Sequence, residues 1–87
     1  MTNYLKVKVT QKNIDDGKCL DMACCPIALA FRKFYPQSFI SVHSSHVLID
    51  LQTYILPDKV IRFIKIFDLN TKARLRLKPF SFRINIW

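Results

Sequence analysis

The sequence predicts an α+β fold in which two helices cover one face of a four-stranded antiparallel sheet. Two segments, 4–9 and 79–86, alternate between apolar and polar residues as half-buried strands do. Two others, 26–35 and 57–70, repeat apolar residues at helical spacing. Two short apolar runs lie between these helical segments. The predicted order is therefore strand, helix, strand, strand, helix, strand.

The first strand presents one apolar and one polar face. Its inward residues are Leu5, Val7 and Val9, and its outward residues are Tyr4, Lys6 and Lys8. Thr10 then has the side chain of a helix N-cap for the short turn 11–16. Gly17 is the sole glycine of the chain, so we expect it to end this turn with a positive φ.

The first long helix is predicted to open at Cys25-Pro26, because proline is favoured at the first helical position. Its apolar stripe runs to about Tyr35, and Pro36 prevents continuation. The residues of this stripe are Ile27, Ala30, Phe31 and Phe34.

The runs 39–42 and 47–51 predict a hairpin around His43-Ser44-Ser45-His46, and 52–56 is interpreted as a connection. Pro57 and Asp58 open the second helix, and Asn70 is a plausible stop. The buried face of this helix would carry Val60, Phe63, Ile64 and Phe67. In the last strand Phe80, Phe82, Ile84 and Ile86 would point inward, and Ser81, Arg83 and Asn85 outward.

This βαββαβ order is that of the ferredoxin-like sandwich, and a related α+β fold with another strand order is the alternative. The chain has 87 residues, too few for two cores, so we predict a single domain over 1–87. The loop 17–25 carries all three cysteines, and we call it the cysteine loop. In this topology it shares one end of the domain with both histidines and the start of the segment 71–78. That end is the first candidate for a functional surface.

The charge of the chain favours a polyanionic partner. The chain contains fourteen Lys and Arg residues and six Asp residues, which gives a formal net charge of +8. Such a balance suits contact with nucleic acid or an acidic protein face, although it also keeps an apolar chain soluble. No apolar run approaches the roughly 20 residues of a membrane span, and an odd number of cysteines suits a reducing compartment. We therefore expect a soluble, cytoplasmic protein.

A basic segment and the outward sheet face form the candidate binding surface. The segment 71–78 carries four cations and no acidic residue. RNA-recognition domains of this topology stack bases on sheet aromatics, but their RNP motif is absent here. The cations of the two helices, Arg32, Lys33, Lys59, Arg62 and Lys65, are interpreted as a solvated surface. The candidate binding residues are Lys72, Arg74, Arg76, Lys78, Lys6, Lys8, Arg83 and Tyr4.

The cysteines and histidines allow a zinc site or a nucleophile as alternatives. Cys19 and Cys24 (or Cys25), with His43 and His46, would supply four N and S ligands, but no C-x-x-C pair is present. Cys25 at a helix start has the position of an activated thiolate, yet no third catalytic member is apparent. We favour the interpretation that CCPIALAF is a structural helix opening, and we expect no catalytic residue, metal or cofactor.

Four motifs in sequence order resemble a set of small phage and prophage-type proteins. They are KVKVTQKNIDDG, CPIALA, LPDKVIRFIKIFD and PFSF, which follow the pattern VTQxxIDxG, CPIALA, FIxxFD, PFSF. The resemblance implies a virus-encoded accessory protein and carries no implied activity. This chain departs from the pattern in being more basic and in its extension TKARLRLK after Asp68.

These observations predict a non-enzymatic, phage-type protein that binds and modulates a host protein or nucleoprotein complex, for example as an inhibitor of a defence system. The alternatives are a nucleic-acid-binding module that uses the basic sheet face and a Cys/His zinc module. We expect it in the cytoplasm of the host cell, without membrane contact. It would be a monomer or a homodimer, with Trp87 as a candidate dimer contact.

Overall fold

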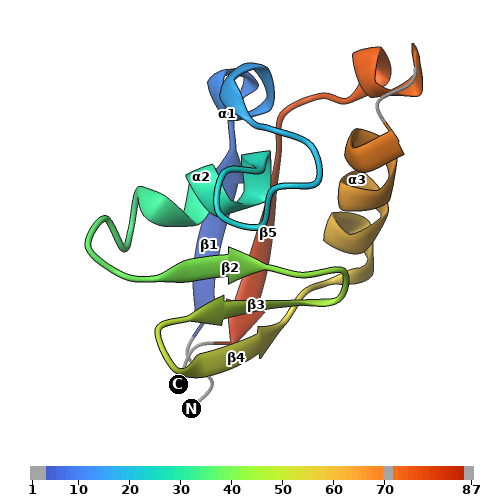
Figure 1. The fold of residues 1–87 in the computed structure, drawn as a ribbon. Helices are drawn as coiled ribbons and strands as arrows, with labels where there is room; N and C mark the ends of the chain where they lie inside the picture. Colours follow the sequence, from blue (N-terminus) through green and yellow to red (C-terminus); the bar gives the residue numbers. More distant parts are fainter. Residues whose placement is uncertain (1–3, 70–71, 86–87) are drawn as a thin grey trace.

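A computed structural model describes residues 4–69 and 72–85, and these form a mixed α+β fold with two antiparallel sheets (Figure 1). The described residues contain five strands, three α-helices and one 3₁₀ helix, η1. The elements in chain order are β1 Tyr4–Val9, α1 Gln11–Asp16, α2 Pro26–Arg32, β2 Ile40–Val42, β3 His46–Ile49, β4 Gln52–Ile55, α3 Asp58–Leu69, η1 Lys72–Arg76 and β5 Phe80–Asn85.

The first sheet pairs the two ends of the chain. β1 and β5 are antiparallel, with Lys6 opposite Arg83 and Val7 opposite Phe82. Because side chains alternate across a strand, Val7 and Phe82 are buried, whereas Lys6 and Arg83 are exposed. The predicted alternation is confirmed in β1 and from Phe82 to Asn85 of β5, whereas Phe80 and Ser81 are both half-buried. Ile86, predicted to point inward, lies outside them.

The second sheet has the order β2–β3–β4, and its strands run crosswise to β1 and β5 in Figure 1. The predicted hairpin is confirmed, with Ile40 opposite Ile49. The interpretation of 52–56 as a connection is wrong, because Gln52–Ile55 forms β4 and pairs with β3. Asp50 and Leu51 make the tight turn between them, and Asp50 adopts a positive φ of 54°.

The prediction of one four-stranded sheet is therefore also wrong. In a ferredoxin-like sheet, β1 would lie beside β3. Here β3 is flanked by β2 on one side and by β4 on the other, so neither edge of β3 is left for β1. Among the described residues, β1 instead pairs only with β5, and the strands form a two-stranded and a three-stranded sheet.

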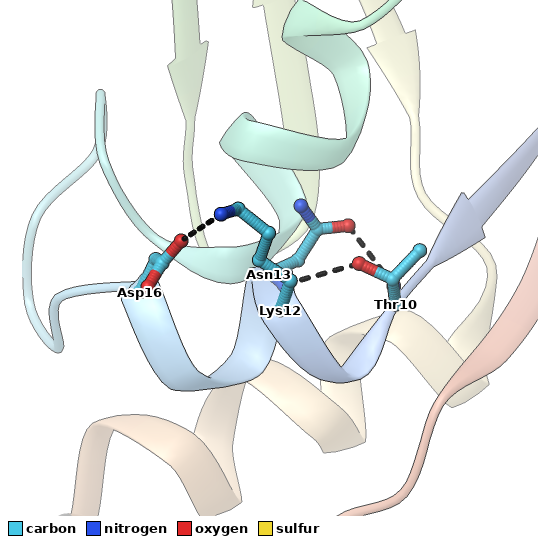
Figure 2. A network of polar contacts seen from close by, with 4 residues as sticks. All are labelled: Thr10, Lys12, Asn13 and Asp16. Carbon is cyan, nitrogen blue, oxygen red and sulfur yellow. Dashed lines mark hydrogen bonds and ion pairs between the residues drawn. The ribbon is translucent and has the colours of Figure 1, made fainter.

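Helix α1 begins with a complete capping box (Figure 2). The Thr10 hydroxyl accepts from the Asn13 N–H at 3.1 Å, and the Asn13 side-chain oxygen accepts from the Thr10 N–H at 2.9 Å. These bonds satisfy backbone donors that a helix start leaves free, so the predicted N-cap is confirmed. Lys12 and Asp16 add an exposed ion pair on the same helix, 3.8 Å between Nζ and Oδ2.

Gly17 follows α1, but its predicted positive φ is wrong. Its φ is −69°, a value that any residue can adopt. A Cβ at this position would lie 2.5 Å from Cγ and Cδ of Pro26. Glycine is therefore required by the close approach of the α2 start and not by backbone conformation.

Helix α2 opens at Pro26 as predicted, but it ends at Arg32, before the predicted end at Tyr35. The Phe34 N–H donates to the Phe31 carbonyl, three residues back, which tightens the last turn. Phe34 is 43% exposed, so its predicted place in the buried stripe is wrong. Ile27, Ala30 and Phe31 are buried as predicted.

Both sheets contribute to one hydrophobic core. Its buried residues come from the inward faces of the strands and from α2 and α3, and the rings of Phe31 and Phe82 meet edge to face at 5.8 Å between centroids. Val60, Phe63 and Phe67 are the buried residues of α3, while Ile64 is half-buried. The predicted stop at Asn70 and the predicted contact at Trp87 lie outside the described residues.

Candidate functional site

The outward face of the β1–β5 sheet brings together the cations predicted there. Lys6 lies directly opposite Arg83, and Lys8 opposite Ser81. The Arg83 guanidinium carbon lies 4.6 Å from the centroid of the Tyr4 ring. This stacking holds a planar group of five N–H donors in place at the surface.

A basic hollow of about 340 Å³ lies where this sheet face meets the start of α3. Three cations line it, namely Lys6, Arg83 and Lys59, which follows the first residue of α3. Pro57, Ser81 and Phe82 complete its lining. We call it the Lys6–Arg83 hollow.

A second hollow of about 400 Å³ lies between α3 and the segment that enters β5. Its cations are Lys59, Arg62, Arg76 and Lys78. Between them lies an apolar floor of Phe63, Ile66, Leu77, Pro79 and Phe80. The rings of Phe63 and Phe80 lie 5.0 Å apart, so the floor is fixed by packing against the core. We call it the apolar-floored hollow.

The two hollows share Lys59, and we refer to the pair as the α3–β5 groove. Among the described residues that line them, none is acidic. Within the described part of the chain, no carboxylate lies within ion-pair distance of the groove cations. Six cations line the groove: Lys6, Lys59, Arg62, Arg76, Lys78 and Arg83.

The predicted basic segment does not act as one patch, because η1 turns its residues to two sides. Arg76 and Lys78 line the groove. Lys72 and Arg74 instead line a hollow against α1, together with Asp15. The Arg74 guanidinium lies 3.9 Å from the centroid of the Phe67 ring, so this residue packs on α3.

Sequence reasoning missed Lys59 and Arg62, which it assigned to a solvated helix surface. Their spacing of three residues places them on one face of α3, and Ile66 continues that face one turn further. This helical spacing could have indicated from the sequence that the two cations share a surface. The packing of the β5 entry segment beside that face could not be known without the fold.

The cysteine loop and one predicted histidine meet at a fourth hollow, of about 670 Å³. Cys25 and His43 line it with mostly apolar residues of the loop, β2 and α3. At its rim, Leu20 has a φ of 57° and a side chain that is 80% exposed. Its N–H donates to the Asp68 carboxylate at 2.9 Å, which holds this unusual backbone in place.

The residues proposed for zinc do not converge. His43 and His46 stack on each other at 4.7 Å between ring centroids, and the His43 Nε2 lies 3.0 Å from the Ser41 hydroxyl. Cys19 and Cys24 are half-buried free thiols. Among the residues that the structure describes, no group of three or more His, Cys, Asp or Glu side chains is placed to hold a metal ion.

Cys25 has a structural role at the start of α2. Its Sγ accepts from the Ala28 N–H at 3.4 Å, and the residue is only 6% exposed. Burial raises the pKa of the Cys25 thiol, and the nearby carboxylates of Asp68 and Asp21 raise it further. A thiol held neutral is a weak nucleophile, and this supports our interpretation of CCPIALAF as a helix opening.

Comparisons with family models, with curated proteins and with solved structures found no match to this chain. In residues 4–69 and 72–85, no helix combines the length and the apolar character needed to cross a membrane.

Proposed function

We propose that this chain is a non-enzymatic binding protein that docks on a polyanionic macromolecule through the α3–β5 groove. The observation that carries the proposal is that, among the described residues, six cations and no acidic side chain line two hollows that share Lys59. Such a surface concentrates positive potential, which attracts an anionic partner and speeds encounter.

The apolar floor adds to this argument. Cations alone would favour any anion weakly, since exposed charge pairs in water contribute little. The half-buried side chains of Ile66, Leu77 and Phe80 give a partner apolar surface to cover, and burial of that surface stabilises a complex. The groove therefore combines long-range attraction with a contact that retains the partner.

The sequence motifs support a biological setting for this binding. Their resemblance to phage and prophage-type proteins suits a viral accessory protein that modulates a host macromolecule in the cytoplasm, including inhibition of a defence system. The extension TKARLRLK, in which this chain departs from the pattern, supplies the groove cations Arg76 and Lys78. Binding is thus associated with the part of the chain most particular to it.

Charge reversals within single elements test the proposal. On α3, Arg62→Glu changes the groove, whereas Lys65→Glu changes an exposed lysine that lines the hollow near Cys25. On η1, Arg76→Glu reverses a charge in the groove, whereas Lys72→Glu reverses a charge in the hollow against α1. Each substitution alters the net charge equally. The measurement is the salt concentration at which each variant leaves a heparin column.

We expect Arg62→Glu and Arg76→Glu to elute at clearly lower salt than the wild type and than their partners on the same element. Circular dichroism melting of all four variants checks that the fold is retained. Equal shifts for Lys65→Glu and Lys72→Glu would show that net charge alone governs binding, and the groove proposal would then be abandoned.

A further inference from the structure

We propose that the partner seated in the α3–β5 groove is a single nucleic-acid strand, an inference that rests on the proposed function. One base covers the apolar-floored hollow, and the adjoining phosphates lie over the Lys6–Arg83 hollow. The observation behind it is that a hollow with an apolar floor and a hollow lined by three cations share Lys59.

The apolar-floored hollow has the properties of a stacking surface. Phe80 is half-buried and lines it, and its ring is held between Phe63 at 5.0 Å and Phe82 at 5.9 Å. Pro79 lies beside it, and Arg62, Arg76 and Lys78 stand around it. Fixed aromatic surface among cations is what single-strand-binding proteins use, because every base has an apolar face.

The Lys6–Arg83 hollow has the properties of a backbone site. Lys6, Lys59 and Arg83 line it, and Ser81 lines the same space. The stacking of Arg83 on Tyr4 restricts its guanidinium before a partner arrives. Less side-chain freedom is then lost on binding, and the planar fork matches phosphate oxygens.

Other polyanions match the groove less well. A duplex keeps its bases inside and presents phosphates, so the apolar floor would remain open to water. An acidic protein face offers carboxylates to the cations, but it has no regular alternation of charge and flat apolar group. A single strand has both groups in every nucleotide, in the order that the two hollows require.

The test measures the affinity of the full chain for four fluorescent probes at several salt concentrations. The probes are a twelve-nucleotide oligo(dT), the same strand with abasic sites, a duplex of equal length and a glutamate peptide of matched charge. We expect oligo(dT) to bind in the micromolar range or tighter, with a log affinity against log salt slope of about −3 to −4. The abasic strand, the duplex and the peptide should each bind about tenfold more weakly.

Two protein variants link this preference to the groove. Arg62→Glu should weaken oligo(dT) binding by about tenfold, while Lys65→Glu should change it by less than about twofold. Phe80→Leu keeps an apolar side chain but removes the ring, so it should reduce the advantage of oligo(dT) over the abasic strand. Melting curves of each variant show whether the fold is retained, and the abasic probe tests stacking without any substitution.

The outcomes separate the two proposals. If the glutamate peptide or the duplex binds as tightly as oligo(dT), and Arg62→Glu still weakens it, the groove is a polyanion site and the single-strand inference is wrong. Equal affinities for oligo(dT) and the abasic strand would also overturn the inference. If no probe binds at the lowest salt, or Arg62→Glu has no effect on any of them, the proposed function fails as well.

Discussion

Cys25 places a titratable thiol in the core at the N-cap of α2. There its sulfur accepts a hydrogen bond from a backbone N–H that the helix start leaves free. The Ala28 N–H reaches its sulfur, and burial raises the pKa of the thiol above its ordinary value of 9.0. The folded protein therefore retains the thiol proton at a pH at which the unfolded chain has lost it. As the pH rises above 9.0, the unfolded state binds fewer protons than the folded state, so the free energy of unfolding decreases.

This linkage gives a prediction for Cys25→Ser. Serine also accepts a hydrogen bond at an N-cap but does not titrate in this range. We expect the wild type to lose stability between pH 8 and pH 10, by at most about 1.4 kcal/mol per pH unit, and the variant to lose measurably less. Urea unfolding at several pH values, with a reductant present, measures both slopes. Identical slopes would contradict a raised pKa at this residue.

The structural role of a single residue can be predicted from the sequence where that role depends on neighbouring backbone groups. Thr10 as an N-cap and Pro26 at a helix start follow from the chemistry of adjacent backbone groups, and both are confirmed. For Gly17, a positive φ is the wrong reason for glycine. The reason is steric, because the loop brings Pro26, nine residues later in the sequence, too close to Gly17 for a Cβ atom. A lone glycine in a sequence does not show whether it meets a conformational or a steric demand.

Among the elements, α1 is short enough that its capping should decide whether it forms. It has six residues, and isolated helices of this length are unstable in water. Thr10→Ala removes the acceptor for the Asn13 N–H, and we expect it to lower the free energy of unfolding by about 1 kcal/mol. Thr10→Ser keeps the hydroxyl and should stay within about 0.5 kcal/mol of the wild type. Chemical denaturation measures both, and equal losses would assign the effect to the lost methyl group.

Elements with strong periodicity were predictable, and β4 was not. In Gln52–Ile55 two of the first three side chains are exposed polar residues, and the only inward one is the half-buried Tyr54. The turn before it, Asp50-Leu51, has no glycine, although Asp50 adopts a positive φ. A strand with so little buried surface has no clear alternation of apolar and polar residues, and the turn before it has no glycine to mark it. Without β4, the sequence predicts one four-stranded sheet in place of two sheets.

For the whole molecule, the excess of positive charge should make stability depend on salt. The Debye length is about 30 Å at 0.01 M ionic strength, which is comparable to the longest dimension of 41 Å, and about 8 Å at 0.15 M. With a net charge of +8, repulsion acts across the molecule at low salt and only between neighbours at physiological salt.

We expect the melting temperature to rise by about 4–8 °C between these two ionic strengths, which corresponds to about 1 kcal/mol for a domain of this size. The double variant Lys59→Glu/Arg62→Glu removes repulsion from the groove, so its melting temperature should rise less. Differential scanning calorimetry in NaCl measures both proteins. A melting temperature that is constant or falls with salt would show that self-repulsion is not significant.

The sequence predicts the basic character of the proposed binding surface but not which residues line it. The charge balance indicated an anionic partner, and the outward residues Lys6 and Arg83 were placed correctly by strand alternation. The sequence predicts a single patch in the segment 71–78, because its cations are close together along the chain. In the structure, Lys72 and Arg74 instead lie on the side of α1. Lys59 and Arg62 joined the surface only through the packing of β5 against α3.

The cysteine loop also determines how copies of this molecule could assemble. The Val42 N–H on the outer side of β2 donates to the Met22 carbonyl of the loop, so this side of the three-stranded sheet is already occupied there. In the described part of the chain, no strand pairs with the outer side of β4. Continuous strand addition needs two free edges on every subunit, and here one is blocked. Within this sheet, pairing of two copies through β4 would therefore stop at a symmetric dimer.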